Sequence, residues 1–168
     1  MSSLNMIASS EFLRAIPAEL HSHLEQLVQQ RSYSPGTSLF SEGAHHDEFH
    51  IIVSGHVRLD MHVPRRGRIP ILTIGPGDVL AWSALLGHGI MTSSAIALDP
   101  IQTVAFPGEA LRELCESHHE IGYHIMRQLA TSLSRRLVAT RLQLLDLFAD
   151  HAPVDLTSAI GRPGDPEC

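Results

Sequence analysis

The sequence predicts an α+β protein that is mainly β, with an antiparallel barrel preceded by short helices and followed by one long helix. Three observations lead to this fold class. The apolar residues repeat with a helical period over residues 10–30, with a strand-like period between Tyr33 and Phe106, and with a helical period again after Pro107. Two changes of period within one chain indicate a β core with helices at both ends.

The first helical segment, SEFLRAIPAELHSHLEQLVQQ, covers residues 10–30. Ser10 is expected to cap it, because a serine hydroxyl can accept a hydrogen bond from a free amide in the first turn. Pro17 is expected to divide the segment into two short helices, because proline has no amide hydrogen to donate.

The central segment alternates as strands do. In VRLDMHV, the apolar Val57, Leu59, Met61 and Val63 alternate with polar residues, which is typical of a strand with one buried and one solvated face. Turn sequences such as SPGT, SEGA, VSGH, PRRGR and GPGD recur at short intervals. This spacing favours a compact antiparallel barrel or sandwich over a parallel sheet with helical crossovers.

The last helix carries an apolar seam. Ser117 followed by Glu120 fits a capping box at its start. Apolar and small residues then alternate at intervals of three and four, which is typical of pairing with a second helix. Packing of the same stripe on the chain's own barrel is the alternative. We favour a parallel homodimer, with a seam formed by Met126, Ala130, Leu133, Leu137, Leu144 and Leu147.

Composition excludes several classes of function. The net charge is −6 and every basic residue is an arginine, so no positive surplus predicts direct contact with DNA or an anionic membrane. No apolar run reaches the roughly 18 residues of a membrane span, and no secretory signal is evident, so we expect a cytoplasmic protein. The chain fits one domain over residues 1–150, with a flexible tail over 151–168 that leaves no room for a DNA-binding domain.

The segment YSPGTSLFSEGAHHDEFHIIVSGHVRLDMHV resembles the opening of cyclic-nucleotide-binding domains. Gly36, Gly43, Gly55 and Gly77 stand where that family turns its barrel. SRRLVATRLQLL is similar to the dimer helix of bacterial catabolite activators, and the resemblance extends over about residues 11–148. It implies a β-roll, a jelly-roll barrel flanked by N-terminal helices and a long C-terminal dimerisation helix.

The resemblance also implies a ligand pocket. In that family, amide groups after a Gly-Asp turn face a cyclic phosphate, an arginine pairs with its charge and a glutamate binds the ribose. Aligned on that turn, Trp82 stands at the glutamate position and Thr92 at the arginine position, so both anchors are absent. The implied pocket residues are Gly77, Asp78, Trp82, Ser83, Thr92, Ser93, Thr140 and Arg141.

Loss of both anchors predicts cyclic-nucleotide binding weakened by roughly two to four decades. A cyclic nucleotide remains a candidate ligand, and no cofactor is expected. Trp82 could stack on a planar ligand or fill its place, and we favour filling. Arg141 could turn inward and supply positive charge, but a solvated position on the helix flank is favoured. Arg135 and Arg136 are also expected to face solvent.

The sequence contains twelve histidines. His45, His46, Asp47, Glu48 and His50 lie close together, and the segment resembles the first metal-binding motif of cupins. Adjacent histidines on a strand point to opposite faces, so one metal ion could not readily use both His45 and His46. We therefore interpret the segment as a polar turn and predict no metal site.

A haem protein is a further alternative. The two residues to test first as haem ligands are His88 and His124.

Taken together, these patterns predict a regulatory module and not an enzyme, since no nucleophile has a supporting motif. The module would sense a small molecule and act on an unknown protein partner through a shift of its seam helix. A dimerisation scaffold without ligand and a metal-binding or haem-binding barrel are the alternatives.

Overall fold

In this computed structural model, residues 3–149 are described. The predicted tail, residues 151–168, lies outside them. Short helices come first: α1 (Ser3–Ser9), α2 (Glu11–Arg14), η1 (Ala18–Leu20) and α3 (His21–Glu25). Eight strands follow: β1 (Gln29–Tyr33), β2 (Ser38–Phe40), β3 (Glu48–Ser54), β4 (Val57–Val63), β5 (Gly67–Ile74), β6 (Val79–Leu80), β7 (Ser94–Ala97) and β8 (Ile101–Pro107). A short helix, α4 (Ser83–Leu86), separates β6 from β7, and α5 (Gly108–Ser117) and α6 (His119–Ala149) end the described chain.

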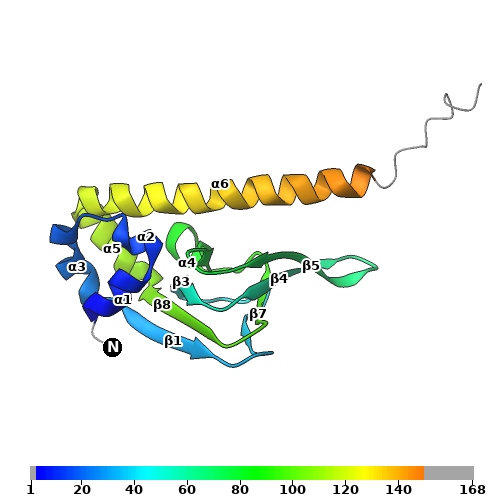
Figure 1. Ribbon diagram of the computed structural model, residues 1–168, viewed down its shortest axis with the longest axis horizontal. Helices are drawn as coiled ribbons and strands as arrows, with labels where there is room; N and C mark the ends of the chain where they lie inside the picture. The colour runs from blue at the N-terminus through cyan, green and yellow to red at the C-terminus, as the bar shows by residue number, and fades with distance from the viewer. Residues whose placement is uncertain (1–2, 150–168) are drawn as a thin grey trace, which may run out of the picture.

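The strands form two antiparallel four-stranded sheets, with the orders β1-β8-β3-β6 and β2-β7-β4-β5. The expected α+β, mainly β fold, a β-roll with helices at both ends, is confirmed. The N-terminal helices lie at one end of the roll, and α6 runs along one side of it (Figure 1). None of the described helices is long and apolar enough to cross a membrane.

Two hydrophobic clusters hold these layers together. The barrel cluster lies between the sheets and includes Phe40, Ile52, Leu59, Leu80 and Met91. The helix-side cluster joins one sheet to the helices, and its buried members include Leu13, Phe49, Phe106, Leu111 and Ile125. Because α5 and α6 contribute to the helix-side cluster, the long helix is anchored to the roll through its first half.

Strand β4 departs from the predicted alternation. Val57 and Leu59 are buried as expected, but Asp60 is only 1% exposed and Met61 is 39% exposed. The register between β4 and β5 shifts between Leu59 and Asp60, and this irregularity reverses which side chains face inward. The buried Asp60 carboxylate accepts hydrogen bonds of 2.8 and 3.0 Å from Arg58, which satisfy its charge.

The position of one predicted helix cap is confirmed without its hydrogen bond, and the predicted capping box is wrong. Ser10 stands at the N-cap of α2, but its hydroxyl makes no capping hydrogen bond, and its buried oxygen has no partner. Ser117 ends α5, where its hydroxyl donates to the carbonyl of Leu114 at 3.2 Å, and α6 starts only at His119. The proposed capping box instead spans the break between two helices.

Two glycines with similar backbones provide a test of how closely the turns pack. Gly55 has a φ of +86°, and a Cβ there would lie 2.4 Å from the carbonyl oxygen of Pro100. Gly36 has a φ of +80° with no atom within 4 Å of the added carbon. Strain and overlap together predict that Gly55→Ala lowers the free energy of unfolding by about 3 kcal/mol or more.

Gly36→Ala is the matched control, since it carries the same backbone strain without the overlap. Its cost is expected to be about 1 kcal/mol. Urea denaturation of both variants measures the difference, and equal losses would contradict a close approach of Pro100 to Gly55.

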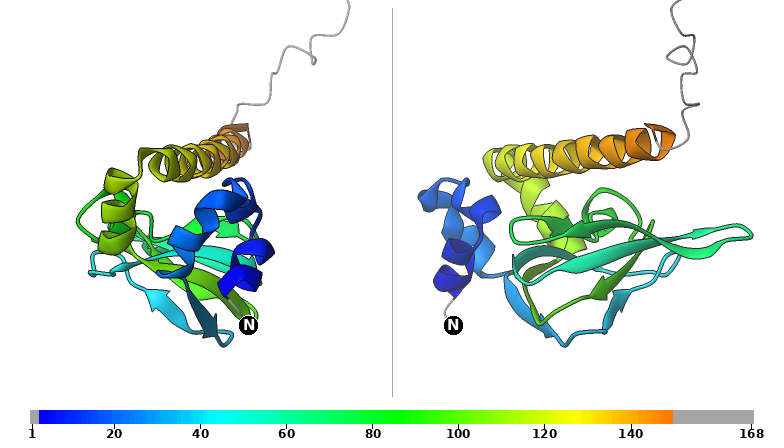
Figure 2. Two further views of the ribbon diagram at one scale, coloured as in Figure 1. Left: turned by 90° about the vertical axis from the view of Figure 1, so that its left-hand side faces the viewer. Right: turned by 45° about the vertical axis from the view of Figure 1, so that its right-hand side comes forward.

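Helix α6 has a buried and an exposed face. Ile121, Ile125, Leu129 and Ser132 are buried against the roll. After Arg136 the helix loses this cover, and every side chain from 141 to 146 is exposed. Figure 2 shows α6 lying over the roll in both further views. Large apolar side chains are at least half exposed at Tyr123, Leu137, Val138, Leu142, Leu144 and Leu145.

The predicted seam residues divide between these two environments. Met126 and Leu133 are partly buried and pack against the helix-side cluster. For these two residues, the alternative to dimer pairing, which is packing on the chain's own roll, is therefore partly correct. Ala130, Leu137 and Leu144 are exposed. The side chain of Leu147 is not among those that the structure describes.

Candidate functional site: a small pocket reached by an arginine from helix α6

A tight turn precedes β6 and positions the expected pocket. Gly77 has a φ of +88°, and its amide donates to the carbonyl of Ile52 at 2.9 Å. The carboxylate of Asp78 accepts a hydrogen bond of 3.1 Å from the amide of Gly75 and closes the turn. In return, the amide of Ile52 donates to the carbonyl of Asp78 at 2.9 Å. The turn is therefore fixed to β3 on both sides.

A small cavity follows this turn, between the start of α4, the loop before β7, and α6. Its volume is about 10 Å³. A cavity needs at least roughly 10–15 Å³ to hold one water molecule, so this one has no room for a nucleotide in this conformation. Its lining residues are Phe40, Leu59, Leu80, Ala81, Trp82, Ser83, Met91, Thr92, Ser93 and Arg136.

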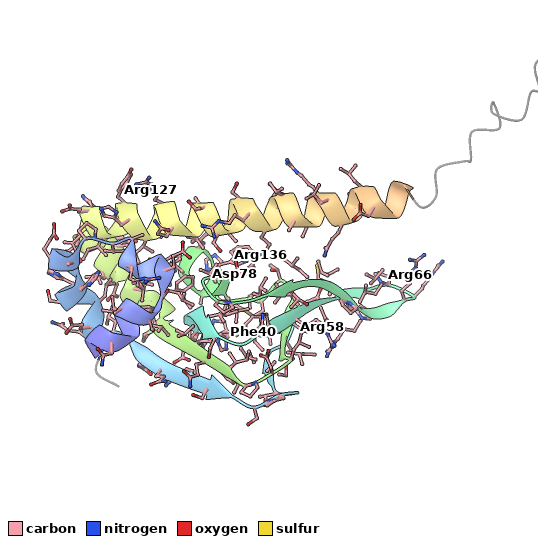
Figure 3. The ribbon with its side chains drawn as sticks, in the orientation of Figure 1. Phe40, Arg58, Arg66, Asp78, Arg127 and Arg136 are labelled. Atoms are coloured by element: carbon pink, nitrogen blue, oxygen red, sulfur yellow. The ribbon has the colours of Figure 1, made fainter. Side chains whose placement is uncertain are left out.

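Arg136 extends from α6 to this cavity. Its Nη2 donates to the carbonyl oxygen of Val79 at 2.5 Å, and its buried Nε has no hydrogen-bond partner. Burial lowers the pKa of Arg136, and the nearby Asp78 carboxylate opposes that shift. In Figure 3, Arg136 points from α6 towards the roll near Asp78, whereas Arg127 points away on the opposite side of the helix. An arginine stays protonated at neutral pH, so a largely desolvated cation faces the cavity.

The structure brings together four of the eight predicted pocket residues. Trp82, Ser83, Thr92 and Ser93 line the cavity, and the expected short helix after the Gly-Asp turn is present as α4. Trp82 is partly buried and also packs against the helix-side cluster. Gly77 and Asp78 shape the turn but do not line the cavity.

The predicted pocket residues on α6 lie elsewhere. The hydroxyl of Thr140 donates back to the carbonyls of Arg136 and Leu137, both at 3.0 Å, and Thr140 is not among the residues that line the cavity. Arg141 is exposed, as the favoured interpretation expected. Arg136 was predicted to face solvent, and this prediction is wrong.

The sequence contains a signal for the inward position of Arg136. It lies four residues after Ser132 and continues the buried stripe formed by Ile125 and Leu129, at helical intervals of three and four. Arginine at the end of a buried stripe indicates a cation directed into the protein.

A second cluster of polar side chains lies at the start of β3. Nε2 of His46 is 2.9 Å from Nε2 of His50, and Nδ1 of His50 is 3.1 Å from the hydroxyl of Thr103. Glu48 lies between the two histidines in sequence and forms an ion pair with Arg31, whose Nε donates to Oε2 at 3.0 Å. His50 is fully buried, so the interpretation of this segment as a polar turn is wrong for that residue.

Burial determines the protonation of this cluster. It lowers the pKa of His50 to about 4, and the neighbouring His46 acts in the same direction. Burial also lowers the pKa of His46, while the hydrogen bond from Arg31 lowers the pKa of Glu48. Both imidazoles are therefore neutral and the carboxyl group is ionised at pH 7.

Comparison with known proteins agrees with this fold. The family model of the cyclic nucleotide-binding domain matches residues 30–118, more than half of the chain. The chain therefore belongs to the cyclic nucleotide-binding domain family.

One relative of this chain is a transcriptional regulator. The chain is 30% identical over 149 residues to the CRP-like cAMP-activated global transcriptional regulator of Mycobacterium tuberculosis. That match covers 88% of this chain and 64% of the relative, so the chain spans less than two thirds of its length.

Two solved structures extend the comparison. The catabolite activator protein of Thermus thermophilus is 25% identical and has a TM-score of 0.64, with 83% of this chain and 63% of that chain covered. A cyclic nucleotide-binding domain from Methylobacillus flagellatus is 20% identical, with a TM-score of 0.75 over 86% of this chain and 85% of that chain. At that identity the second likeness supports the fold alone.

Proposed function

We propose that this chain is a CRP-like regulatory module that links the state of its pocket to the position of α6. The observation that carries the proposal is the reach of Arg136 from α6 to the carbonyl of Val79 beside the cavity. A ligand that enters the cavity has to displace or engage this side chain. Because Arg136 stands on the long helix, such a change is passed directly to α6.

The cationic side chain indicates the class of ligand. Nε of Arg136 is buried and has no hydrogen-bond partner, which is costly unless another group pairs with it. An anionic ligand would supply that partner. We propose an anionic small molecule as the ligand, bound after the cavity opens.

The same pocket disfavours cyclic nucleotides. Trp82 and Thr92 line the cavity and occupy the positions at which the family resemblance places a glutamate and an arginine. The cassette is therefore proposed to have lost its specificity for these ligands. The M. tuberculosis relative is a cAMP-activated regulator, and we propose that this chain differs from it in its response to cyclic AMP.

Pairing of α6 with the same helix of a second copy is the second part of the proposal. Leu137 and Leu144 are each at least half exposed on the C-terminal half of the helix, where the roll gives no cover. Leucines exposed at heptad spacing are typical of a coiled-coil surface. The homodimer would carry a shift of α6 from the pocket to a protein partner.

Thermal denaturation with cyclic AMP and cyclic GMP tests the pocket. At millimolar concentration neither nucleotide is expected to change the melting temperature of the protein. A ligand present at a hundred times its dissociation constant adds about 2.7 kcal/mol to the stability, which corresponds to several degrees for a domain of this size. A rise of that size with either nucleotide would overturn the proposed loss of specificity.

A further inference from the structure

The segment from His45 to His50 sends alternate side chains to opposite sides. Nδ1 of His45 and Oδ1 of Asp47 pair at 2.9 Å, and both side chains are largely exposed. His46, Glu48 and His50 gather on the other side. Their ligand atoms all lie within 4.8 Å of one another. The period of two residues in an extended chain explains this separation.

The backbone fixes this arrangement. The amide of His46 donates to the carbonyl of Gly89 at 2.8 Å, and His45 pairs with Ile90 in an isolated β-bridge. The chain is therefore already extended before β3 starts at Glu48. The sequence predicts no metal site because His45 and His46 diverge. They do diverge, but the residues that converge are those at positions 46, 48 and 50.

The two imidazoles are oriented for a shared partner. Their rings are stacked with centroids 5.2 Å apart, and each directs Nε2 at the other. The hydroxyl of Thr103 lies 3.1 Å from Nδ1 of His50. In the tautomer in which Nδ1 donates to this hydroxyl, Nε2 of His50 carries the lone pair that a metal ion needs. Outer hydrogen bonds of this kind orient histidine ligands in metal sites.

The carboxylate completes the set. Oε2 of Glu48 is 3.7 Å from Nε2 of His50. The bond between Glu48 and Arg31 holds the carboxylate in place, and this cation also reduces the affinity for a metal ion. The ring of Phe40 lies 5.3 Å from that of His46 and that of Tyr33 lies 6.2 Å from that of His50, so aromatic side chains surround the nitrogen ligands.

We propose that His46, Glu48 and His50 bind one divalent transition-metal ion of the zinc class. Two imidazole nitrogens and one carboxylate oxygen form a ligand set that Zn²⁺ accepts, and three protein ligands leave a fourth position open. With bonds of about 2.0–2.1 Å and tetrahedral geometry, the two nitrogens would stand roughly 3.3 Å apart. They are 2.9 Å apart here, so the partly exposed His46 has to move slightly outward, and the carboxylate oxygen, 3.7 Å from Nε2 of His50, has to move slightly inward.

Zinc titration of the full chain tests the site. The protein is first dialysed against EDTA and then titrated by calorimetry with Zn²⁺, and separately with Mg²⁺, which prefers oxygen ligands. One Zn²⁺ and no Mg²⁺ should bind per chain. Co²⁺ should give visible absorption bands, which report nitrogen ligation in a site of low coordination number.

Variants separate this cluster from the other histidines. His46→Ala and Glu48→Gln are expected to weaken Zn²⁺ binding by at least about 100-fold, because each loses a direct ligand. His45→Ala is the matched control, since it removes the adjacent histidine without changing the cluster, and it should bind Zn²⁺ like the unmodified protein. His50 is fully buried, so its substitution is avoided.

Circular dichroism and the melting temperature confirm that each variant is folded before titration. Absence of Zn²⁺ binding to the unmodified chain would overturn the proposal. Equal affinities of the folded His46→Ala and His45→Ala variants would also overturn it, because binding would then lie elsewhere on this histidine-rich chain.

Discussion

The double variant Leu137→Glu/Leu144→Glu is expected to be a monomer under conditions in which the unmodified chain is a dimer. Both leucines are at least half exposed on the single chain, and the proposed seam buries them against the partner helix. Burial of a leucine contributes about 1.5–3 kcal/mol, and four side chains change in each dimer. The dimer dissociation constant should therefore rise by at least about a thousand-fold. Size-exclusion chromatography with light scattering measures the mass.

Leu142→Glu is the matched control for this experiment. Leu142 is 58% exposed on the same half of α6, but it is not among the predicted seam residues. The control introduces the same change of side chain and should leave the dimer intact. A monomeric unmodified chain at high concentration would contradict the seam, and so would a dimer that survives the double substitution.

Sequence patterns predicted the fold because they report what each segment buries. The return to a helical period after Pro107 matches the start of α5 at Gly108, whereas the change to a strand period was placed too late, because β1 already starts at Gln29 and ends at Tyr33. Local signals failed where a tertiary contact decided the outcome. Alternation through VRLDMHV predicted Asp60 at the surface, but the irregularity in register with β5 turned this carboxylate inward beside Arg58.

The candidate pocket was predicted only in part, for a similar reason. The Gly-Asp turn and α4 are local features, and the residues that follow them line the cavity. Arg136 reaches the cavity from more than 50 positions further along the chain, as its bond to Val79 shows. Its sequence neighbours alone do not distinguish a solvated helix flank from a buried stripe. Only the register set by Ile125, Leu129 and Ser132 does so.

The histidine cluster shows the same limit at shorter range. Inspection of adjacent residues led to His45 and His46, which diverge. The extended backbone instead brings together residues two positions apart, and Thr103 of β8 completes the environment of His50 from a distant part of the chain. A pattern of alternate histidine and acidic residues in a strand is therefore the more useful signal for a site of this kind.

Replacement of both absent anchors, Trp82→Glu/Thr92→Arg, is expected to create cyclic AMP binding. Thr92 is exposed and lines the cavity, so an arginine there can extend towards a phosphate. Replacing the indole of Trp82 also opens space in a cavity of only about 10 Å³. Each restored charged hydrogen bond contributes about 1.5–3 kcal/mol, which predicts an affinity for cyclic AMP higher by roughly two to four decades. Calorimetry measures the change.

The variant Trp82→Gln/Thr92→Gln is the matched control, since it opens the same space without the two charges. Both variants lose the packing of Trp82 against the helix-side cluster and should melt at a lower temperature than the unmodified protein. Cyclic AMP should raise the melting temperature of Trp82→Glu/Thr92→Arg alone, because only that variant can bind both the ribose and the phosphate. If cyclic AMP stabilised the glutamine control to the same extent, space and not the missing charges would limit binding, and Arg136 would already supply enough positive charge for the phosphate.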